Sequence, residues 1–149
     1  MPKLTQNLLI LVAEDDPDDR LLIQSAFEEN NLSNPLLFVE DGEALMDYLC
    51  WQESYATRED NSKPGIIILD LNMPRKSGRQ ALHEIKSNPE LRSIPVIVLT
   101  TSSLPEDIQA CYDAGANSFV CKPVTFEKLG AALKTIEEYW FRISVLPSS

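Results

Sequence analysis

The hydrophobic residues along the chain follow two patterns that alternate. Five short runs are almost wholly apolar, and the longer stretches between them carry apolar residues every three or four positions. The short runs are typical of strands buried on both faces, and the longer spacing is typical of helices. The sequence therefore predicts an α/β fold, a doubly wound sheet of five parallel strands at 8–13, 36–39, 66–69, 96–99 and 119–121.

Local signals mark the ends of several of the intervening helices. Asp16 directly precedes a proline and Thr125 precedes an apolar stretch, so both are predicted N-caps. Ser103 and Glu106 have the spacing of a capping box, which predicts a helix start beside them. Gly115 predicts the end of that helix. Strands and helices therefore alternate, as expected of a parallel sheet with crossover helices.

The length of the chain, 149 residues, is that of one domain. We expect a single domain whose core covers about 8–140, followed by a tail at 141–149. The segment 51–64 is polar and longer than the roughly 2–6 residues usual between a helix and the next strand, which predicts an inserted loop.

The charge balance and the cysteines limit the classes of function. With 23 acidic and 13 basic residues, the formal net charge is −10, which repels a phosphate backbone or an anionic membrane surface. We therefore expect no direct nucleic-acid binding and no membrane association. The longest apolar run is far shorter than the roughly 20 residues of a membrane helix. Because Cys50, Cys111 and Cys121 are odd in number and form no CxxC, we expect reduced thiols and a cytoplasmic location.

Polar side chains follow four of the predicted strands at the point where each strand ends. Glu14 and Asp15 come after the first, Asp70 after the third, Thr100 after the fourth and Lys122 after the fifth. The carboxyl ends of parallel strands share one edge of the sheet, which is where such folds bind their ligands. Clustered carboxylates repel one another unless a cation lies among them, and a hard divalent ion such as Mg²⁺ prefers oxygen ligands. The sequence predicts a Mg²⁺ site at this edge.

Asp70 is the candidate nucleophile within this set. It ends a strand of isoleucines, which holds its carboxylate rigidly, and carboxylates form aspartyl-phosphates. Thr100 and Lys122 offer a hydroxyl and a mobile point charge to the oxygens of a phosphoryl group. Taken singly, the acidic run at 14–19 is better explained as a solvated helix start, Asp70 is equally well explained as a helix cap, and Thr100 and Lys122 are weaker signals still. Their arrangement at the ends of strands in one sheet is what favours a phosphoacceptor site.

With these motifs the sequence resembles a two-component response-regulator receiver domain, which implies a flavodoxin-like (βα)5 fold. The similarity runs from about residue 8 to residue 139. It implies that Asp70 is the phosphoacceptor, that Asp15 is a metal ligand, and that Glu14 is the second member of the acidic pair, which contacts the metal directly or through water. It also implies that the backbone carbonyl of Asn72 completes the metal site.

The same resemblance assigns further roles near the site. Thr100 and Phe119 match the switch hydroxyl and switch aromatic positions, and Lys122 matches the lysine that contacts phosphate. A ring without a hydroxyl at Phe119 cannot make the hydrogen bond of a tyrosine. The resemblance also implies a cis peptide bond between Lys122 and Pro123.

Several details are similar to the single-domain regulators that serve cyanobacterial and bacterial phytochromes. These are the acidic run at 14–19, the inserted loop, the basic segment at 74–79 and the closing residues 136–140. The resemblance implies a histidine kinase of phytochrome type as phosphodonor, and a signal passed by protein contact or by phosphorelay. It implies no enzymatic turnover beyond Mg²⁺-dependent self-phosphorylation from a phosphodonor and slow autodephosphorylation.

Three other functions are weighed against this one. A flavin-binding module would carry Ser, Thr and Gly after the first strand, where this chain has Glu14-Asp15-Asp16-Pro17. A Mg²⁺-dependent aspartyl phosphatase would have a second acid two residues after the nucleophile, where Asn72 stands. A receiver-like interaction module that works without phosphorylation stays open, although it would not need the full set of site residues.

The end of the chain predicts an interface. The helical stripe that starts at Phe126 continues past the part of the helix that a five-stranded sheet can cover. Exposed apolar area of this kind marks interfaces, and aromatic residues are common at their centres. We expect a two-fold homodimer, since closed pairs are the commonest assembly, with contacts by Tyr139, Trp140, Phe141 and Ile143. The competing expectation is that the tail folds back on its own domain.

Overall fold

A computed structural model describes residues 8–50 and 63–147 of the chain. Its five strands form one parallel sheet in the order β2-β1-β3-β4-β5. The strands are β1 (Ile10–Ala13), β2 (Leu36–Val39), β3 (Ile66–Leu69), β4 (Val96–Thr100) and β5 (Ser118–Cys121). The predicted five-stranded parallel sheet is therefore confirmed, and the strand bounds differ from the expected ones by at most two residues. Most of the segment 51–64, where a loop insertion is expected, lies outside the described residues.

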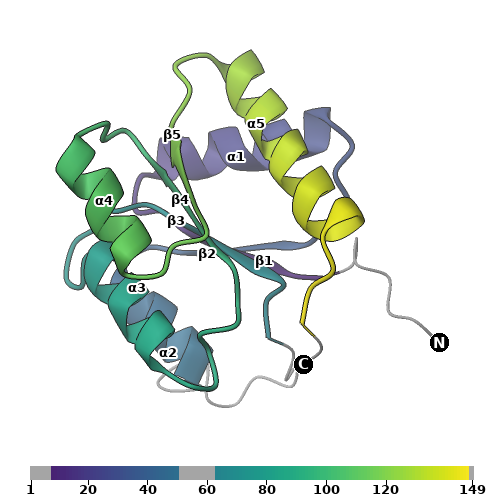
Figure 1. Cartoon of the computed structure of the whole chain (residues 1–149). Helices are drawn as coiled ribbons and strands as arrows, with labels where there is room; N and C mark the ends of the chain where they lie inside the picture. Colours follow the sequence, from purple (N-terminus) through teal and green to yellow (C-terminus); the bar gives the residue numbers. More distant parts are fainter. Residues whose placement is uncertain (1–7, 51–62, 148–149) are drawn as a thin grey trace.

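Five α-helices cover the two faces of the sheet (Figure 1). One face carries α1 (Pro17–Glu29) and α5 (Phe126–Glu138), and the other carries α2 (Gly42–Cys50), α3 (Gly78–Ser87) and α4 (Pro105–Asp113). Successive side chains along a strand point to opposite faces of the sheet, so each strand contributes to both layers of the core. In β1, Leu11 and Ala13 pack toward α2–α4, while Ile10 and Val12 pack toward α1 and α5. The three central strands are buried throughout because both faces are covered.

The helix ends confirm some of the predicted caps. The Asp16 side chain accepts a hydrogen bond from the Asp18 N–H at the start of α1, and Thr125 accepts one from the Lys128 N–H at the start of α5. Gly115 follows the end of α4 with φ +107°, a conformation that L side chains rarely adopt.

The start of α4 differs from the prediction. Its N-cap is Leu104 and no side chain caps it, so the capping box expected of Ser103 and Glu106 is wrong. Ser102 orders this loop instead: its hydroxyl donates to Asp107 at 2.6 Å and accepts a hydrogen bond from the Leu104 N–H. The spacing that suggests a capping box is met elsewhere, by Ser77 and Gln80 at the start of α3.

The peptide bond between Lys122 and Pro123 is trans, because no cis bond occurs in the described part of the chain, and the predicted cis bond is wrong. The trans form is favoured by about 0.5–1 kcal/mol before proline. In this conformation the Lys122 N–H donates to the Thr100 carbonyl at 2.7 Å, which continues the pairing of β5 with β4.

The tail folds back on the sheet in part. After α5 the chain forms a π-helical turn, η3 (Tyr139–Ile143), in which Phe141 is only 2% exposed. Its ring lies over Gly65, where any Cβ atom would be 2.8 Å from it. Phe141 is therefore a core residue, and its predicted place in a dimer interface is wrong. No helix among residues 8–50 and 63–147 is both long and apolar enough to cross a bilayer.

Candidate functional site at the carboxyl edge of the sheet

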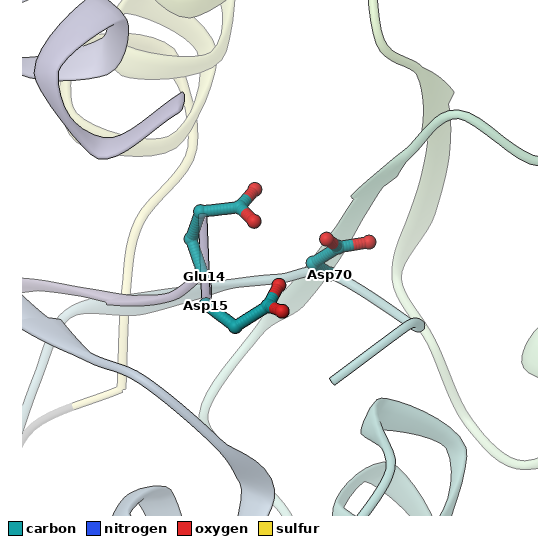
Figure 2. Close-up of side chains that lie close together, drawn as sticks. All are labelled: Glu14, Asp15 and Asp70. Atoms are coloured by element: carbon teal, nitrogen blue, oxygen red, sulfur yellow. The ribbon is translucent and has the colours of Figure 1, made fainter. Parts of the chain in front are cut away.

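Three carboxylates from two neighbouring strands converge at the carboxyl edge of the sheet. Glu14 and Asp15 directly follow β1 and Asp70 directly follows β3, and Figure 2 shows their side chains close together. The Asp70 N–H donates to the Ala13 carbonyl at 3.0 Å, so the pairing of the strands sets their spacing. One oxygen from each carboxylate lies within 4.8 Å of the others. All three donors are hard oxygens, which fits a divalent cation such as Mg²⁺.

Two of the three carboxylates are buried, which disfavours their charged forms. Glu14 and Asp70 are 2% and 7% exposed. Burial raises the pKa of Glu14 to about 7; the hydrogen bond from Lys122 opposes this shift and the charge of Asp70 adds to it. Buried carboxylates are stable only with a compensating cation, so the site calls for positive charge at this edge.

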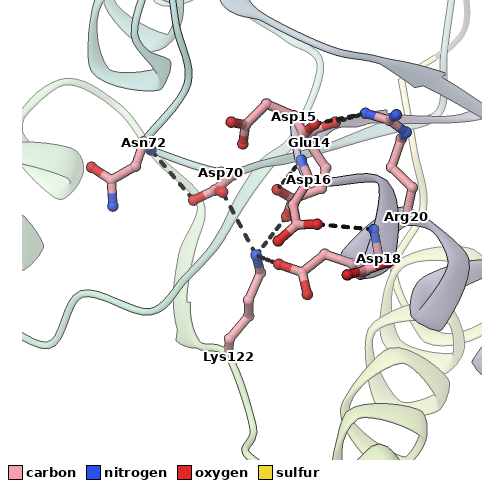
Figure 3. Close-up of polar contacts among 9 residues, drawn as sticks. Glu14, Asp15, Asp16, Asp18, Arg20, Asp70, Asn72 and Lys122 are labelled. Carbon is pink, nitrogen blue, oxygen red and sulfur yellow. Dashed lines mark hydrogen bonds and ion pairs between the residues drawn. The ribbon is translucent and has the colours of Figure 1, made fainter.

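Lys122 supplies one such charge from the end of β5 (Figure 3). Its Nζ lies 2.5 Å from Glu14 Oε1, 2.8 Å from Asp19 Oδ2 and 3.6 Å from Asp70 Oδ2. Burial alone lowers the pKa of Lys122, but hydrogen bonds to Asp19 and Glu14 and the charges of Glu14 and Asp70 outweigh it, so the pKa is raised. The ammonium is therefore fully charged and directed at the carboxylates.

The Thr100 hydroxyl lies at this edge of the sheet and has no hydrogen-bond partner among the described residues. Thr100 is fully buried at the end of β4, and its Oγ1 makes no hydrogen bond within the described part of the chain. Because buried hydroxyls are nearly always hydrogen-bonded, this unpaired hydroxyl is available to a group that binds at the strand end. Asn72 lies next to Asp70, and its N–H approaches Asp70 Oδ1 at 3.4 Å (Figure 3). The metal contact of its carbonyl oxygen stays a prediction.

Phe119 lies within β5, half-buried against the layer of α2–α4. It pairs with Val98, whereas Thr100 pairs with Cys121, so the two predicted switch residues stand on adjacent strands two positions apart in register. The Phe119 N–H donates to the Tyr112 hydroxyl at 3.1 Å, which ties β5 to α4. Their coupling as a switch stays a prediction.

Two contacts at the site were missed in the sequence. Arg20 Nη1 donates to the carbonyls of Glu14 and Asp15 at 2.8 and 3.1 Å and thereby orders the turn that carries both carboxylates (Figure 3). Asp19 binds Lys122, as given above. The only signal in the sequence is that both residues lie in the first turn of the helix that follows the acidic pair, and the direction of α1 decides which side chains face the site.

Comparison with known proteins places this geometry in a family. Residues 10–134 match the response regulator receiver domain family. The chain belongs to this family. The flavodoxin-like receiver fold expected from the sequence is thereby confirmed.

The similarity to known response regulators extends over nearly the whole chain. Response regulator Rcp1 of Synechocystis sp. is 37% identical over 141 residues, which are 95% of this chain and 94% of that protein. The crystal structure of the phosphorylated cyanobacterial phytochrome response regulator RcpA is 39% identical, with a TM-score of 0.87 over 95% of this chain and 99% of that one. The crystal structure of the Mn²⁺-bound form of Rcp1 is 36% identical, with a TM-score of 0.85 and the same shares covered. The chain is therefore similar to phytochrome response regulators, as the sequence predicts.

Proposed function

We propose that this receiver domain takes a phosphoryl group from a histidine kinase onto Asp70 and signals through the change of shape that follows. The observation that carries the proposal is the convergence of the Asp70 carboxylate with those of Glu14 and Asp15, which follow β1, and with the Lys122 ammonium, which follows β5. A nucleophile in this position meets positive charge where negative charge has to be neutralised.

The reaction divides among the residues as follows. An Asp70 carboxylate oxygen attacks phosphorus and forms the new P–O bond, while the bond from phosphorus to the donor nitrogen or oxygen breaks and the donor keeps the electron pair. A divalent cation held by Glu14, Asp15, Asp70 and the Asn72 carbonyl would neutralise phosphoryl oxygens. Lys122 and the free Thr100 hydroxyl bind the oxygens of the product.

Intact mass after incubation with Mg²⁺ and acetyl phosphate tests the phosphoacceptor. Wild-type protein should gain one phosphoryl group, and Asp70→Asn or excess chelator should abolish the gain. Circular dichroism of Asp70→Asn provides the control for folding. Full labelling of Asp70→Asn, or no labelling of folded wild type under any condition, would contradict the proposal and favour an interaction module that works without phosphorylation.

The switch assigned to Thr100 and Phe119 forms a second part of the proposal. The Thr100 hydroxyl would move to the phosphoryl group, and the Phe119 ring would turn inward behind it. Thr100→Ala should therefore accept phosphate without changing partner affinity. If Thr100→Ala and wild type shift partner affinity equally on phosphorylation, the switch is wrong.

The partner we propose is a histidine kinase of phytochrome type, supported by the similarity to Rcp1 and RcpA. The output is a protein contact or relayed phosphoryl group, and slow autodephosphorylation returns the protein to its resting state. Free Cys50, Cys111 and Cys121 support the proposed cytoplasmic location. Phosphotransfer from a purified phytochrome kinase, compared with kinases of other sensors, tests the partner.

A homodimer around the end of α5 completes the proposal. Tyr139, Ile143 and Val145 are 49%, 66% and 93% exposed, whereas Trp140 is half-buried and Phe141 is in the core. The exposed side chains form the smaller interface that these positions allow. Replacing Tyr139 and Ile143 by Ser should convert the dimer to monomer in sedimentation. A wild-type monomer at tens of micromolar would contradict it.

A further inference from the structure

Asp19 binds the ammonium of Lys122 from the first turn of α1. Its Oδ2 lies at hydrogen-bond distance, 2.8 Å, whereas Asp70 Oδ2 is 3.6 Å from the same nitrogen. A lysine ammonium has three donors, and Glu14 and Asp19 take two of them. Lys122 therefore forms an ion pair with the proposed phosphoacceptor Asp70 but hydrogen-bonds only to Glu14 and Asp19.

The three carboxylates around Lys122 differ in their access to water. The side chains of Glu14 and Asp70 are 3% and 9% exposed, and that of Asp19 is 31% exposed. A carboxylate that loses its cation in the interior is left without solvation, while one at the surface is hydrated again. Asp19 is therefore the partner that Lys122 leaves at the smallest cost.

We propose that Asp19 is a positioning residue that restrains Lys122 before phosphorylation and releases it to the phosphoryl oxygens afterwards. The inference rests on the proposed function and adds a residue to it. Without the charge of Asp19, Lys122 moves toward Asp70, where it favours the phosphorylated form and competes with the divalent cation. Removal of Asp19 therefore strengthens phosphorylation and weakens cation binding, and both effects pass through Lys122.

Variants of the full chain test this. Asp19→Asn removes the charge with little change of shape, and Asp18→Asn is the matched control, since Asp18 is an exposed neighbour whose carboxylate makes no described contact with Lys122. Each is compared in wild type and in Lys122→Met. The measurements are Mn²⁺ affinity by electron paramagnetic resonance, without phosphodonor, and phosphorylated fraction by intact mass at saturating Mg²⁺ and a limiting concentration of acetyl phosphate.

Asp19→Asn should raise the Kd for Mn²⁺ and raise the phosphorylated fraction, each by roughly two- to fivefold, the range of a partly exposed ion pair. Asp18→Asn should do much less. In Lys122→Met the two substitutions should have equal effects, because a general charge effect is all that is left. Asp19→Glu should keep wild-type values, because it retains a carboxylate within reach of Lys122.

The outcomes separate this inference from the proposed function. Equal effects of Asp18→Asn and Asp19→Asn in wild type overturn the inference alone, provided that the wild type binds Mn²⁺ and is phosphorylated. An Asp19→Asn effect that persists undiminished in Lys122→Met also overturns it. A wild type that neither binds Mn²⁺ nor accepts phosphate overturns the proposed function and this inference together.

Discussion

Two lysines at opposite edges of the sheet show how different the same side chain can be. Lys122, at the carboxyl edge, contacts Glu14, Asp19 and Asp70, all of them carboxylates. Lys86, in the last turn of α3, donates to the carbonyls of Arg92 and Ile94 at 2.9 Å and to Asn117 Oδ1 at 3.2 Å, beside the amino ends of β4 and β5. One lysine meets charges and the other meets neutral oxygens.

The partners explain what each lysine does. The donors of Lys86 are satisfied by neutral oxygens, and through these hydrogen bonds Lys86 joins the loops before β4 and β5. Asn117 in turn accepts a hydrogen bond from the Val96 N–H, so this network is complete within the fold. Around Lys122 a single ammonium faces three carboxylates, and the orphan Thr100 hydroxyl lies at the same edge. That excess of negative charge and the unused donor make one edge receptive to a cation and a phosphoryl group, while the other edge is closed.

The largest effect should come from exchanging each lysine for methionine and measuring phosphorylation. Lys122→Met removes the charge-assisted contact that we propose to phosphoryl oxygens, and the phosphorylated fraction at limiting acetyl phosphate should fall roughly 10- to 100-fold. Lys86→Met provides the matched control and should leave phosphorylation of the folded protein unchanged. Equal losses in both variants would show that Lys122 and Lys86 do not differ in their contribution to phosphorylation.

Gly115→Ala tests how strongly the backbone is restrained at the amino edge of the sheet, beside Lys86. The φ of Gly115, +107°, is unfavourable for alanine, and a Cβ there would lie 2.9 Å from Lys86 Cγ. Gly115→Ala should lower the free energy of unfolding by about 2 kcal/mol, measured by urea denaturation. The Lys86 stem can give way, so most of the loss reflects the backbone. A neutral or stabilising Gly115→Ala would show that this turn is not restrained as described.

The site at the open edge was largely predictable from sequence, for a simple physical reason. Unbroken apolar runs show where each strand ends, and a parallel sheet brings those ends to one edge, so Glu14, Asp15, Asp70 and Lys122 are placed together without knowledge of any side-chain contact. The contact of Asp19 with Lys122 depends on how α1 leaves the sheet, which hydrophobic spacing does not specify.

The end of the chain was predicted less well because its packing is non-local. The apolar spacing suggests one straight helix past residue 138, yet the chain changes to a π-helical turn that buries Phe141 over Gly65, a residue far away in sequence. The same limit applies to Lys86, whose three acceptors lie 6, 8 and 31 residues further along the chain. Contacts of this kind require the fold before they can be recognised.

Lys86→Met should have a smaller effect on stability than Gly115→Ala. The three acceptors of Lys86 lose their donor, but two of the three hydrogen bonds are exposed to water, which replaces the donor there. The free energy of unfolding should fall by about 1 kcal/mol in urea denaturation. Lys134→Met, at an exposed position of α5, serves as the control for loss of a lysine charge. A loss no larger than that of the control would show that Lys86 does not fasten the two loops.

The smallest expected effect is a dependence of the Lys86 contribution on pH. Burial lowers the pKa of Lys86 below its ordinary value of 10.5. Between the lowered folded-state pKa and 10.5 the unfolded state binds more protons than the folded state, so the free energy of unfolding rises with pH in that window. The difference in stability between wild type and Lys86→Met should therefore increase as pH approaches 10.5, and urea midpoints of both proteins at several pH values measure it. A difference that shrinks with pH would mean that the three neutral oxygens around Lys86 hold the ammonium more strongly than burial disfavours it, and that Lys86 is electrostatically closer to Lys122 than the contrast drawn here allows.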